Sequence, residues 1–285
     1  MNKIMLFLKG MLMGICDLIP GISGGTIAFI TGIYPKLIHS VKSISPKFFK
    51  NLITLNKKEL KKDVKEIDFP FLIVLILGIL TSIIIGSRII KYLLENYFSF
   101  TIAFFIGLVL SSSKIIFDNI KNHGLKNIFF GFIGLAIGIM FAFLIPLEIT
   151  PTLSYVALGG FIGISAMFLP GISGAFILLI MGIYEFIINA LHSPLENITV
   201  IVVFIIGVIA GAFVISRIIS FLFKKDKCKT LYFLLGLVIG SLSVPIKRIL
   251  SKSLNYFEIS YVVFFVFLGA LIVLYINNLL SKKKP

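Results

Sequence analysis

The pentapeptide P-G-x-S-G occurs twice in the chain, at residues 20–24 and 170–174, and each copy interrupts an apolar stretch. Proline and glycine break a helix and free backbone N–H and C=O groups that lipid cannot satisfy. A loop that leads into a new helix offers N–H donors and the positive end of the helix dipole, which suit phosphate or carboxylate. The residues expected to bind an anion are Gly21, Ser23, Gly24, Gly25 and Thr26 in the first tip, and Gly171, Ser173 and Gly174 in the second.

Close helix packing is the alternative explanation for these small residues, because glycine and serine also line helix–helix contacts in membranes. A single copy would favour that explanation. Two copies at equivalent places in the chain favour a pair of anion-binding tips instead.

Two arginines also occupy equivalent places, Arg88 in GSRII (86–90) and Arg217 in ISRII (215–219). An arginine near the end of a membrane span is often an anchor that extends its guanidinium to the interface. The guanidinium is also suited to bidentate phosphate binding. Because the equivalence gives one arginine for each side of the membrane, we expect both to bind substrate.

Asp17 precedes the first tip, and its counterpart in the second is Met167. A lone carboxylate in an apolar hairpin is costly, so it is a candidate for function by default. Asp17 could accept a coupling proton or pair with an arginine. It could also be a structural cap on the hairpin backbone.

Signatures of enzymes and metal sites are sparse in the sequence. The G-x-x-x-x-G-K-[ST] motif of ATP-hydrolysing proteins is absent. His39, His123 and His192 are isolated and lack metal-ligand spacing, and Ser23 and Ser173 have no histidine near them in the sequence. We therefore expect no catalytic residue, no metal and no cofactor, apart from proton or sodium coupling as an open possibility.

The composition places these residues in a membrane. Of 285 residues 58% are hydrophobic and only 14% are charged, and the mean hydropathy is +1.09. Several apolar runs reach the length of a membrane span. Most of the net charge of +15 lies in short segments between these runs, which indicates cytoplasmic loops rather than nucleic-acid binding.

The chain is an internal duplication. Residues 20–34 match residues 170–184 at an offset of 150, whereas Gly78 and Gly107 match Gly207 and Gly236 at an offset of 129. The first half therefore holds 21 additional residues, which its lysine-rich stretch accounts for. The predicted first repeat, 1–146, comprises a hairpin (4–34), a basic insertion (35–68) and spans at 69–87, 98–113 and 128–145; the second, 147–285, comprises a hairpin (153–191) and spans at 198–223, 231–245 and 259–280.

The basic insertion (35–68) is expected either to lie on the membrane surface, because Phe48, Phe49, Leu52, Ile53 and Leu55 stand among many lysines, or to be a plain solvated loop.

Charge then predicts orientation by the positive-inside rule. The two termini and the basic segments that precede the first, third and fifth spans are expected in the cytoplasm. Residues 147–152 and 191–197 carry no lysine or arginine and are expected outside. Lys247, Arg248 and Lys252 violate the pattern. Each half then has one re-entrant hairpin and three spans. Because three is odd, the second half begins on the opposite side of the membrane from the first, and the two halves are inverted. The fold expected is an all-α integral membrane protein of the cell membrane with inverted-topology repeats, an arrangement typical of secondary transporters.

The segments DLIPGISGGTIAFITGIY (17–34) and FLPGISGAFILLIMGIY (168–184) resemble those of the polyprenyl-phosphate transporter family, formerly a family of unknown function. The resemblance covers nearly the whole chain. It implies a flippase that returns undecaprenyl phosphate, the lipid carrier of cell-wall precursors, from the outer to the inner leaflet; in an archaeon the cargo would be dolichyl phosphate.

Two other functions remain open from the residues alone. One is a channel or carrier for a small anion, and the other is an intramembrane lipid phosphatase, which the missing nucleophile–base pair disfavours. The partners expected are the polyprenyl-phosphate lipid and membrane lipids, and the sequence leaves the tail length, the coupling ion and the oligomeric state open.

Overall fold

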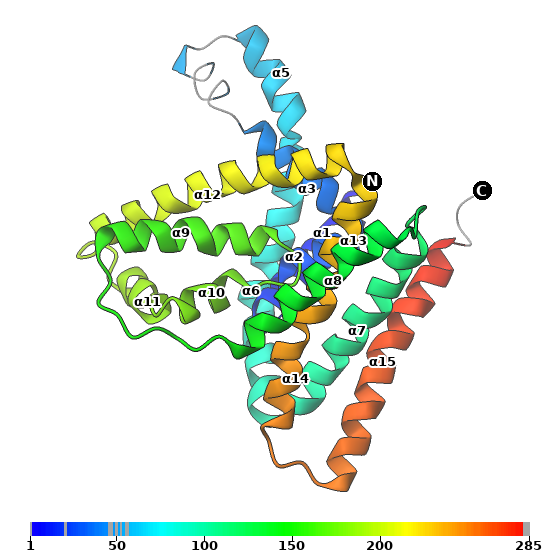
Figure 1. Cartoon of the computed structure of the whole chain (residues 1–285). Coiled ribbons are helices and arrows are strands. Elements are labelled where there is room, and N and C mark those ends of the chain that lie inside the picture. Colours follow the sequence, from blue (N-terminus) through cyan, green and yellow to red (C-terminus); the bar gives the residue numbers. More distant parts are fainter. Residues whose placement is uncertain are drawn as a thin grey trace.

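A computed structural model describes residues 2–19, 22–44, 48, 51, 53, 54 and 57–281, and all regular secondary structure in these residues is helical. The elements in chain order are α1 Lys3–Asp17, α2 Gly24–Ile30, α3 Tyr34–Ser43, α5 Lys57–Ile67, α6 Phe69–Asn96, α7 Phe98–Asp118, α8 Leu125–Met140, the 3₁₀ turn η1 Phe141–Phe143, α9 Leu153–Phe168, α10 Gly174–Ile180, α11 Tyr184–His192, α12 Ile198–Lys225, α13 Lys227–Ser241, α14 Ser243–Leu250 and α15 Tyr256–Ser281. Figure 1 shows α9 to α12 as one group and α7, α8, α13 and α15 as another, with α1, α2 and α6 between them.

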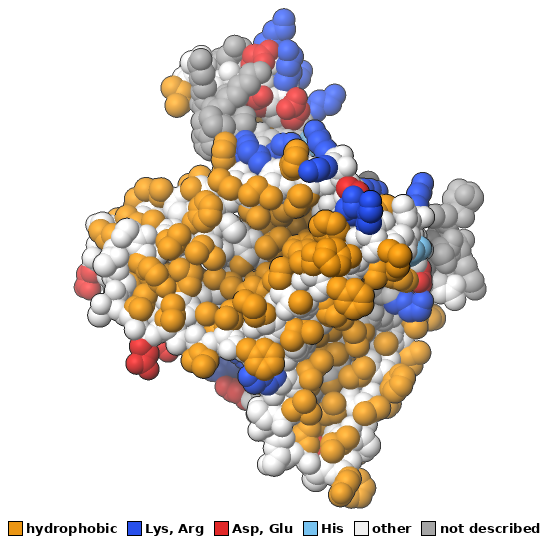
Figure 2. All heavy atoms as spheres, in the orientation of Figure 1, with side chains coloured by type: hydrophobic (Ala, Val, Ile, Leu, Met, Phe, Trp, Pro, Cys, Tyr) orange, Lys and Arg blue, Asp and Glu red, His pale blue; other side chains and the backbone are white. Residues whose placement is uncertain are grey.

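Six helices in the described residues are long and apolar enough to cross a membrane, namely α6, α7, α8 with η1, α12, α13 with α14, and α15. They coincide with the six predicted spans. The bent pair α10 and α11, which meet at 110°, raises the number to seven if it counts as one broken span. Apolar side chains cover much of the surface of these helices in Figure 2, as lipid contact requires.

Several helices extend beyond the predicted spans, and α6 continues past residue 87 to Asn96. Its last two turns mix apolar side chains with Lys91, Glu95 and Asn96. Lys91 and Glu95 lie four residues apart with Nζ and Oε1 at 3.8 Å, and the Asn96 amide donates to the Tyr92 carbonyl at 2.9 Å. Such local pairs stabilise a helix end that extends past the apolar run.

Both hairpins turn by the same backbone motif. After α2, Gly32 has a φ of 75° and the Ile33 N–H donates to the Ala28 carbonyl at 3.0 Å. After α10, Gly182 has a φ of 70° and the Ile183 N–H donates to Leu178 at 3.0 Å. This is the Schellman end of a helix, in which glycine tolerates the left-handed conformation.

The short helix α3 follows this turn, as α11 follows the second, so the first residues of the predicted basic insertion (35–68) are helical. Pro35 lies in the first turn of α3. Proline is tolerated there, since the first N–H groups of a helix have no intrahelical partner.

The part of the insertion that the structure describes is anchored by polar contacts. Lys36 Nζ and Asp68 Oδ2 lie 2.6 Å apart at its base, and this hydrogen bond lowers the pKa of Asp68. The Asn51 side chain donates to Asp63 at 2.7 Å. In Figure 1, α5 projects away from the other helices, which favours a solvated segment over one lying flat on the membrane. Phe49, Leu52 and Leu55 lie outside the described residues.

Helix α1 packs in parallel on α6. Their backbones touch where glycines face each other, because a Cβ on Gly10 would meet the Leu75 carbonyl and a Cβ on Gly78 would meet that of Phe7. One turn farther along both helices, Gly14 lies against Ser82. Side chains larger than hydrogen at these glycines would separate the two helices.

Helices α9 and α12 repeat this contact. A Cβ on Gly160 would meet the Phe204 carbonyl, and one on Gly207 would meet that of Ala157. These positions follow from the first pair by the offsets of 150 and 129 found in the sequence. The duplication therefore includes the packing contact as well as the residues.

The remaining long helices pair across the two halves, α7 with α15 and α8 with α13. A Cβ on Gly107 of α7 would meet the Val266 carbonyl, and one on Gly236 of α13 would meet the Gly131 carbonyl. The phenyl rings of Phe100 and Phe265 also stack, with centroids 5.6 Å apart. The first half thus supplies α7 and α8, and the second half completes these pairs with α15 and α13.

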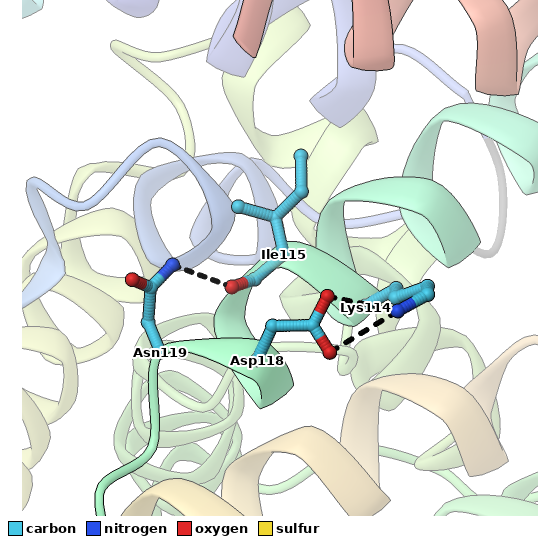
Figure 3. A network of polar contacts seen from close by, with 4 residues as sticks. All are labelled: Lys114, Ile115, Asp118 and Asn119. Atoms are coloured by element: carbon cyan, nitrogen blue, oxygen red, sulfur yellow. Dashed lines mark hydrogen bonds and ion pairs between the residues drawn. The ribbon is translucent and has the colours of Figure 1, made fainter. Parts of the chain in front are cut away.

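The end of α7 is fixed by its own polar side chains, drawn in Figure 3. Lys114 Nζ contacts both carboxylate oxygens of Asp118, at 3.1 and 2.8 Å. The Asn119 amide donates to the Ile115 carbonyl at 2.7 Å, which satisfies one of the free carbonyls at a helix C-terminus. The charged residues end the span before the loop to α8.

Candidate functional site

The two P-G-x-S-G tips lie against each other. The Gly171 N–H of the second tip donates to Thr26 Oγ1 of the first at 2.7 Å, and the Tyr34 hydroxyl donates to the Phe168 carbonyl at 2.8 Å. Tyr34 is only 1% exposed. Part of the backbone freed by the two breaks is therefore satisfied by the opposite hairpin.

The N–H donors of the first tip are taken up within the hairpin. The Gly24 N–H donates to Asp17 Oδ1 at 2.7 Å, and the Gly25 N–H donates to Ser23 Oγ at 3.2 Å. A Cβ on Gly24 would lie 2.5 Å from Asp17 Oδ2, so glycine is required for this approach. The Asp17 carboxylate thus occupies the place where the sequence predicts an anion. Gly21 lies outside the described residues.

The second tip differs because Met167 stands where the first has Asp17. Ser173 Oγ accepts from the Phe176 N–H at 3.4 Å. The N–H groups of Gly174 and Ala175 have no hydrogen-bond partner within the described part of the chain. A pocket borders this tip, lined by Phe141, Gly171, Ile172, Ser173, Phe176, Ser241 and Val244. A ligand can reach the second tip more readily than the first.

Changing Thr26 to valine is expected to loosen the contact between the tips. The isosteric side chain removes Oγ1 and leaves the Gly171 N–H without a partner, which costs about 1–3 kcal/mol. Hydrogen exchange of the peptide containing Gly171 measures the effect, and it should become faster. Thr31→Val is the matched control, because Thr31 Oγ1 donates only to the Ile27 carbonyl of its own helix. Equal exchange in both variants would contradict the role of Thr26.

The structure places the two arginines at equivalent depths in equivalent helices. Arg88 lies eight residues before the end of α6 at Asn96, and Arg217 lies eight residues before the end of α12 at Lys225. Eight residues of helix span about 12 Å. Both arginines therefore lie deeper within their helices than the predicted boundaries implied.

Their side chains differ in environment. The Arg88 side chain is exposed on α6. Arg217 Nη1 donates to the Phe213 carbonyl at 2.8 Å, and its guanidinium carbon lies 3.3 Å from the centroid of the Phe213 ring. Among the described residues, neither arginine has a hydrogen bond or ion pair with Asp17 or with a tip. The structure thus brings the two tips and Asp17 together, but not the arginines.

Two polar contacts at the site were not predicted from the sequence. Tyr34 and Tyr184 end the two GIY segments, and this repetition was the available signal for the Tyr34 contact. Lys9 was assigned only to topology, yet its Nζ donates to the Thr31 carbonyl at 2.7 Å at the end of α2. A cation at the C-terminus of a helix is favoured there, but a lone lysine in an apolar segment gives no pattern that names its partner.

The arrangement offers little to a catalytic or metal-dependent reaction. Ser23 Oγ and Ser173 Oγ both accept hydrogen bonds as helix caps. His123 Nδ1 lies 2.6 Å from the Tyr232 hydroxyl, where α13 meets the loop before α8. In the portion of the chain that is described, no group of three or more His, Cys, Asp or Glu side chains could hold a metal ion.

Fold and site together define a multi-span helical membrane protein in which two duplicated broken-helix tips meet. The chain matches the undecaprenyl phosphate translocase-like family over residues 13–260 and belongs to that family.

Two relatives are similar over most of their length. The chain is 37% identical over 257 residues to a polyprenyl-phosphate transporter of Vibrio cholerae serotype O1, a match that covers 90% of this chain and 82% of the relative. It is 29% identical over 253 residues to a polyprenyl-phosphate transporter of Staphylococcus aureus, covering 82% of this chain and 83% of the relative. No solved structure matches the chain.

Proposed function

We propose that the protein is a polyprenyl-phosphate transporter that moves undecaprenyl phosphate, or the equivalent lipid of its host, from the outer to the inner leaflet for reuse in cell-envelope synthesis. Membership of the translocase-like family supports a transporter rather than an enzyme. The observation that carries the proposal is the meeting of the two tips, with a pocket at the second tip that Gly171 and Ser173 line, next to N–H groups of Gly174 and Ala175 that have no partner among the described residues. These donors suit a phosphate group, whereas the isoprenoid tail stays in lipid.

The inverted repeat is part of this proposal, and the helix pairs support it. If α6 runs outward, then α7 runs inward, α8 outward, α12 inward, α13 outward and α15 inward. The four observed parallel pairs, α1 with α6, α9 with α12, α7 with α15 and α8 with α13, each join helices of the same direction under this scheme. Both termini then lie in the cytoplasm, and the first hairpin enters from inside and the second from outside.

Labelling with a membrane-impermeant thiol reagent tests this topology. Single cysteines at Thr150 and Leu195 are expected to react in intact cells, because both residues are exposed and lie on the outer side. A cysteine at Lys121 serves as the control and should react only after permeabilisation. Cys16 is buried and Cys228 is half-buried, and both are replaced by serine to remove background labelling. Labelling at 150 and 195 from the cytoplasm alone would contradict the inverted repeat.

The headgroup site that we propose combines the second tip, the first tip with Asp17, and the two arginines. The Asp17 carboxylate now occupies the Gly24 N–H of the first tip. Protonation of Asp17, or its pairing with a cation such as sodium, would weaken that bond and open the donor to phosphate. Asp17 thereby couples an ion to the headgroup, and the lipid is the partner that the protein recognises.

Alanine at either arginine is expected to impair transport about tenfold, which corresponds to losing one charged hydrogen bond. Arg88→Ala should weaken capture from the outer leaflet, and Arg217→Ala should slow release on the inner side. Lysine at either position keeps the charge but loses the bidentate geometry, so it should also impair binding. Lys91→Ala on α6 is the matched control, because Lys91 is exposed and pairs with Glu95. Unchanged transport by the double alanine variant would leave both arginines as interfacial anchors.

Vesicles that contain a short-chain polyprenyl phosphate test the function itself. A phosphatase added outside hydrolyses only the lipid in the outer leaflet, so the protected fraction measures the inner pool. The purified protein should make the whole pool accessible, whereas empty vesicles should retain the protected half. Uptake of inorganic phosphate without movement of the lipid would instead identify a carrier for a small anion. In cells, depletion of the protein should accumulate polyprenyl phosphate on the outer face.

A further inference from the structure

Three basic residues on the proposed outer side have no explanation in the topology, namely Lys247, Arg248 and Lys252. Outer segments of membrane proteins usually carry few lysines and arginines. Two of the three belong to α14, which continues α13 after a slight break at Leu242. Lys247 and Arg248, the two that belong to α14, lie close to residues that line the pocket at the second tip.

Arg248 lies on the same face of α14 as a residue that lines the pocket. Ser241 and Val244 line the pocket together with Gly171 and Ser173 of the tip. Arg248 lies four residues beyond Val244, so it stands one turn farther along the same face of α14. Arg248 therefore lies one turn from a residue that lines the pocket.

Lys247 contacts η1, which borders the other side of the pocket. Its Nζ donates to the Ala142 carbonyl at 2.8 Å and lies 5.2 Å from the centroid of the Phe143 ring. Ala142 and Phe143 belong to η1, whose first residue, Phe141, lines the pocket. The ammonium group has three N–H donors, and one of them is used by this contact. The other two remain for a ligand.

The positive charge of this pair is not compensated. Within the described residues, neither Lys247 nor Arg248 has a carboxylate within ion-pair distance. Two cations without a carboxylate partner among the described residues, next to a pocket that Ser173 lines, suit a doubly charged phosphate monoester.

Apolar surface beside the same pocket suits a lipid tail. Phe143 is 70% exposed and Ile145 is 80% exposed, and both follow directly from the turn that holds Lys247. A phosphate on the basic pair would leave its isoprenoid chain against these side chains and in the bilayer. Free phosphate would gain the charged contacts but not this apolar contact.

We infer that Lys247 and Arg248 form the outer-leaflet capture site, which takes the phosphate monoester headgroup of the lipid and passes it to the second tip. The inference rests on the proposed function and names the residues that receive the headgroup first, ahead of Arg88. Lys252 has no part in the site, because its Nζ lies 4.4 Å from the centroid of the Phe98 ring at the start of α7.

The experiment uses the full chain in vesicles of known orientation, with short-chain polyprenyl phosphate supplied to the outer leaflet. The double variant Lys247→Gln/Arg248→Gln should need about tenfold more lipid phosphate for half-maximal transport. Lys252→Gln removes the same kind of charge on the same side and should behave as wild type. Arg248→Gln alone should give part of the effect, since among the described residues the only side-chain hydrogen bond at Arg248 is the one that its backbone carbonyl accepts from Ser251. Thermal unfolding of each variant in detergent checks that the loss of the Ala142 contact has not unfolded the protein.

Inorganic phosphate added outside distinguishes the two sources of the ligand. Competition that depends on Lys247 and Arg248 supports a site that recognises the phosphate group itself, and competition by the lipid alone supports one that also requires the tail. Wild-type concentration dependence in the folded double variant, or an equal loss with Lys252→Gln, would overturn the inference. A wild-type protein that moves no lipid phosphate would instead overturn the proposed function.

Discussion

Gly78→Ala is expected to abolish transport and to reduce the amount of folded protein in the membrane. The added methyl group would meet the Phe7 carbonyl of α1, and a backbone atom cannot move aside as a side chain can. Overpacking of this kind costs about 3 kcal/mol. Since α1 carries Asp17 and leads into the first tip, separating α1 from α6 also displaces the site. Thermal unfolding and lipid-phosphate transport in vesicles measure the two effects.

Gly86→Ala is the matched control on the same helix. The nearest atom to a Cβ there is Ile15 Cγ1 at 3.8 Å, an ordinary contact. Alanine is also the better helix former by about 1 kcal/mol, so this variant should be at least as stable as wild type. If Gly78→Ala and Gly86→Ala are equally harmless, the close approach of α1 and α6 does not hold the hairpin in place.

Two substitutions at Asp17 should separate its electrostatic role from its structural one. Asparagine keeps an oxygen that can accept the Gly24 N–H bond, which is 2.7 Å long in the native chain, but it carries no charge and takes up no proton. Asp17→Asn is therefore expected to remain folded while its transport no longer depends on pH. Asp17→Ala also loses the cap and should lose about 1–3 kcal/mol of stability in addition.

Transport at several pH values and thermal unfolding give the two readouts for this series. Thr31→Val in the same hairpin controls for general damage, because the Thr31 hydroxyl donates only to the Ile27 carbonyl of its own helix. A wild-type pH response in Asp17→Asn would remove this carboxylate from ion coupling. It would leave Asp17 as a cap on the hairpin backbone.

Repetition made much of this fold predictable. The six spans and the duplicated segments could be located from apolar length and from two constant offsets, because each reflects local sequence. The family resemblance rested on the same two tips. Boundaries were less predictable, as α6 shows, since its last turns depend on the Lys91–Glu95 pair rather than on hydropathy.

Contacts between distant segments could not be predicted in the same way. Thr26 and Gly171 were both candidate ligands of an anion, but nothing in either tip shows that one donates to the other. The role of the Asp17 carboxylate as the partner of Gly24 was one of three interpretations that the sequence left open. Which alternative applies depends on how the hairpin folds back, and a sequence of apolar residues does not specify that angle.

Helix α7 packs on α15 and α8 packs on α13, so each pair joins the two halves of the chain. This pairing has a consequence for the order in which the protein assembles during biosynthesis. Helices α7 and α8 leave the ribosome well before α13 and α15 exist, so they enter the bilayer with their glycine faces against lipid. The first half therefore cannot complete its own packing and must wait for the second. If the proposed inverted repeat is correct, a single half before the gene duplicated would have found these contacts only in another copy of itself, inserted in the opposite direction. Because both halves now belong to one polypeptide, each molecule contains the partner helices that α7 and α8 need.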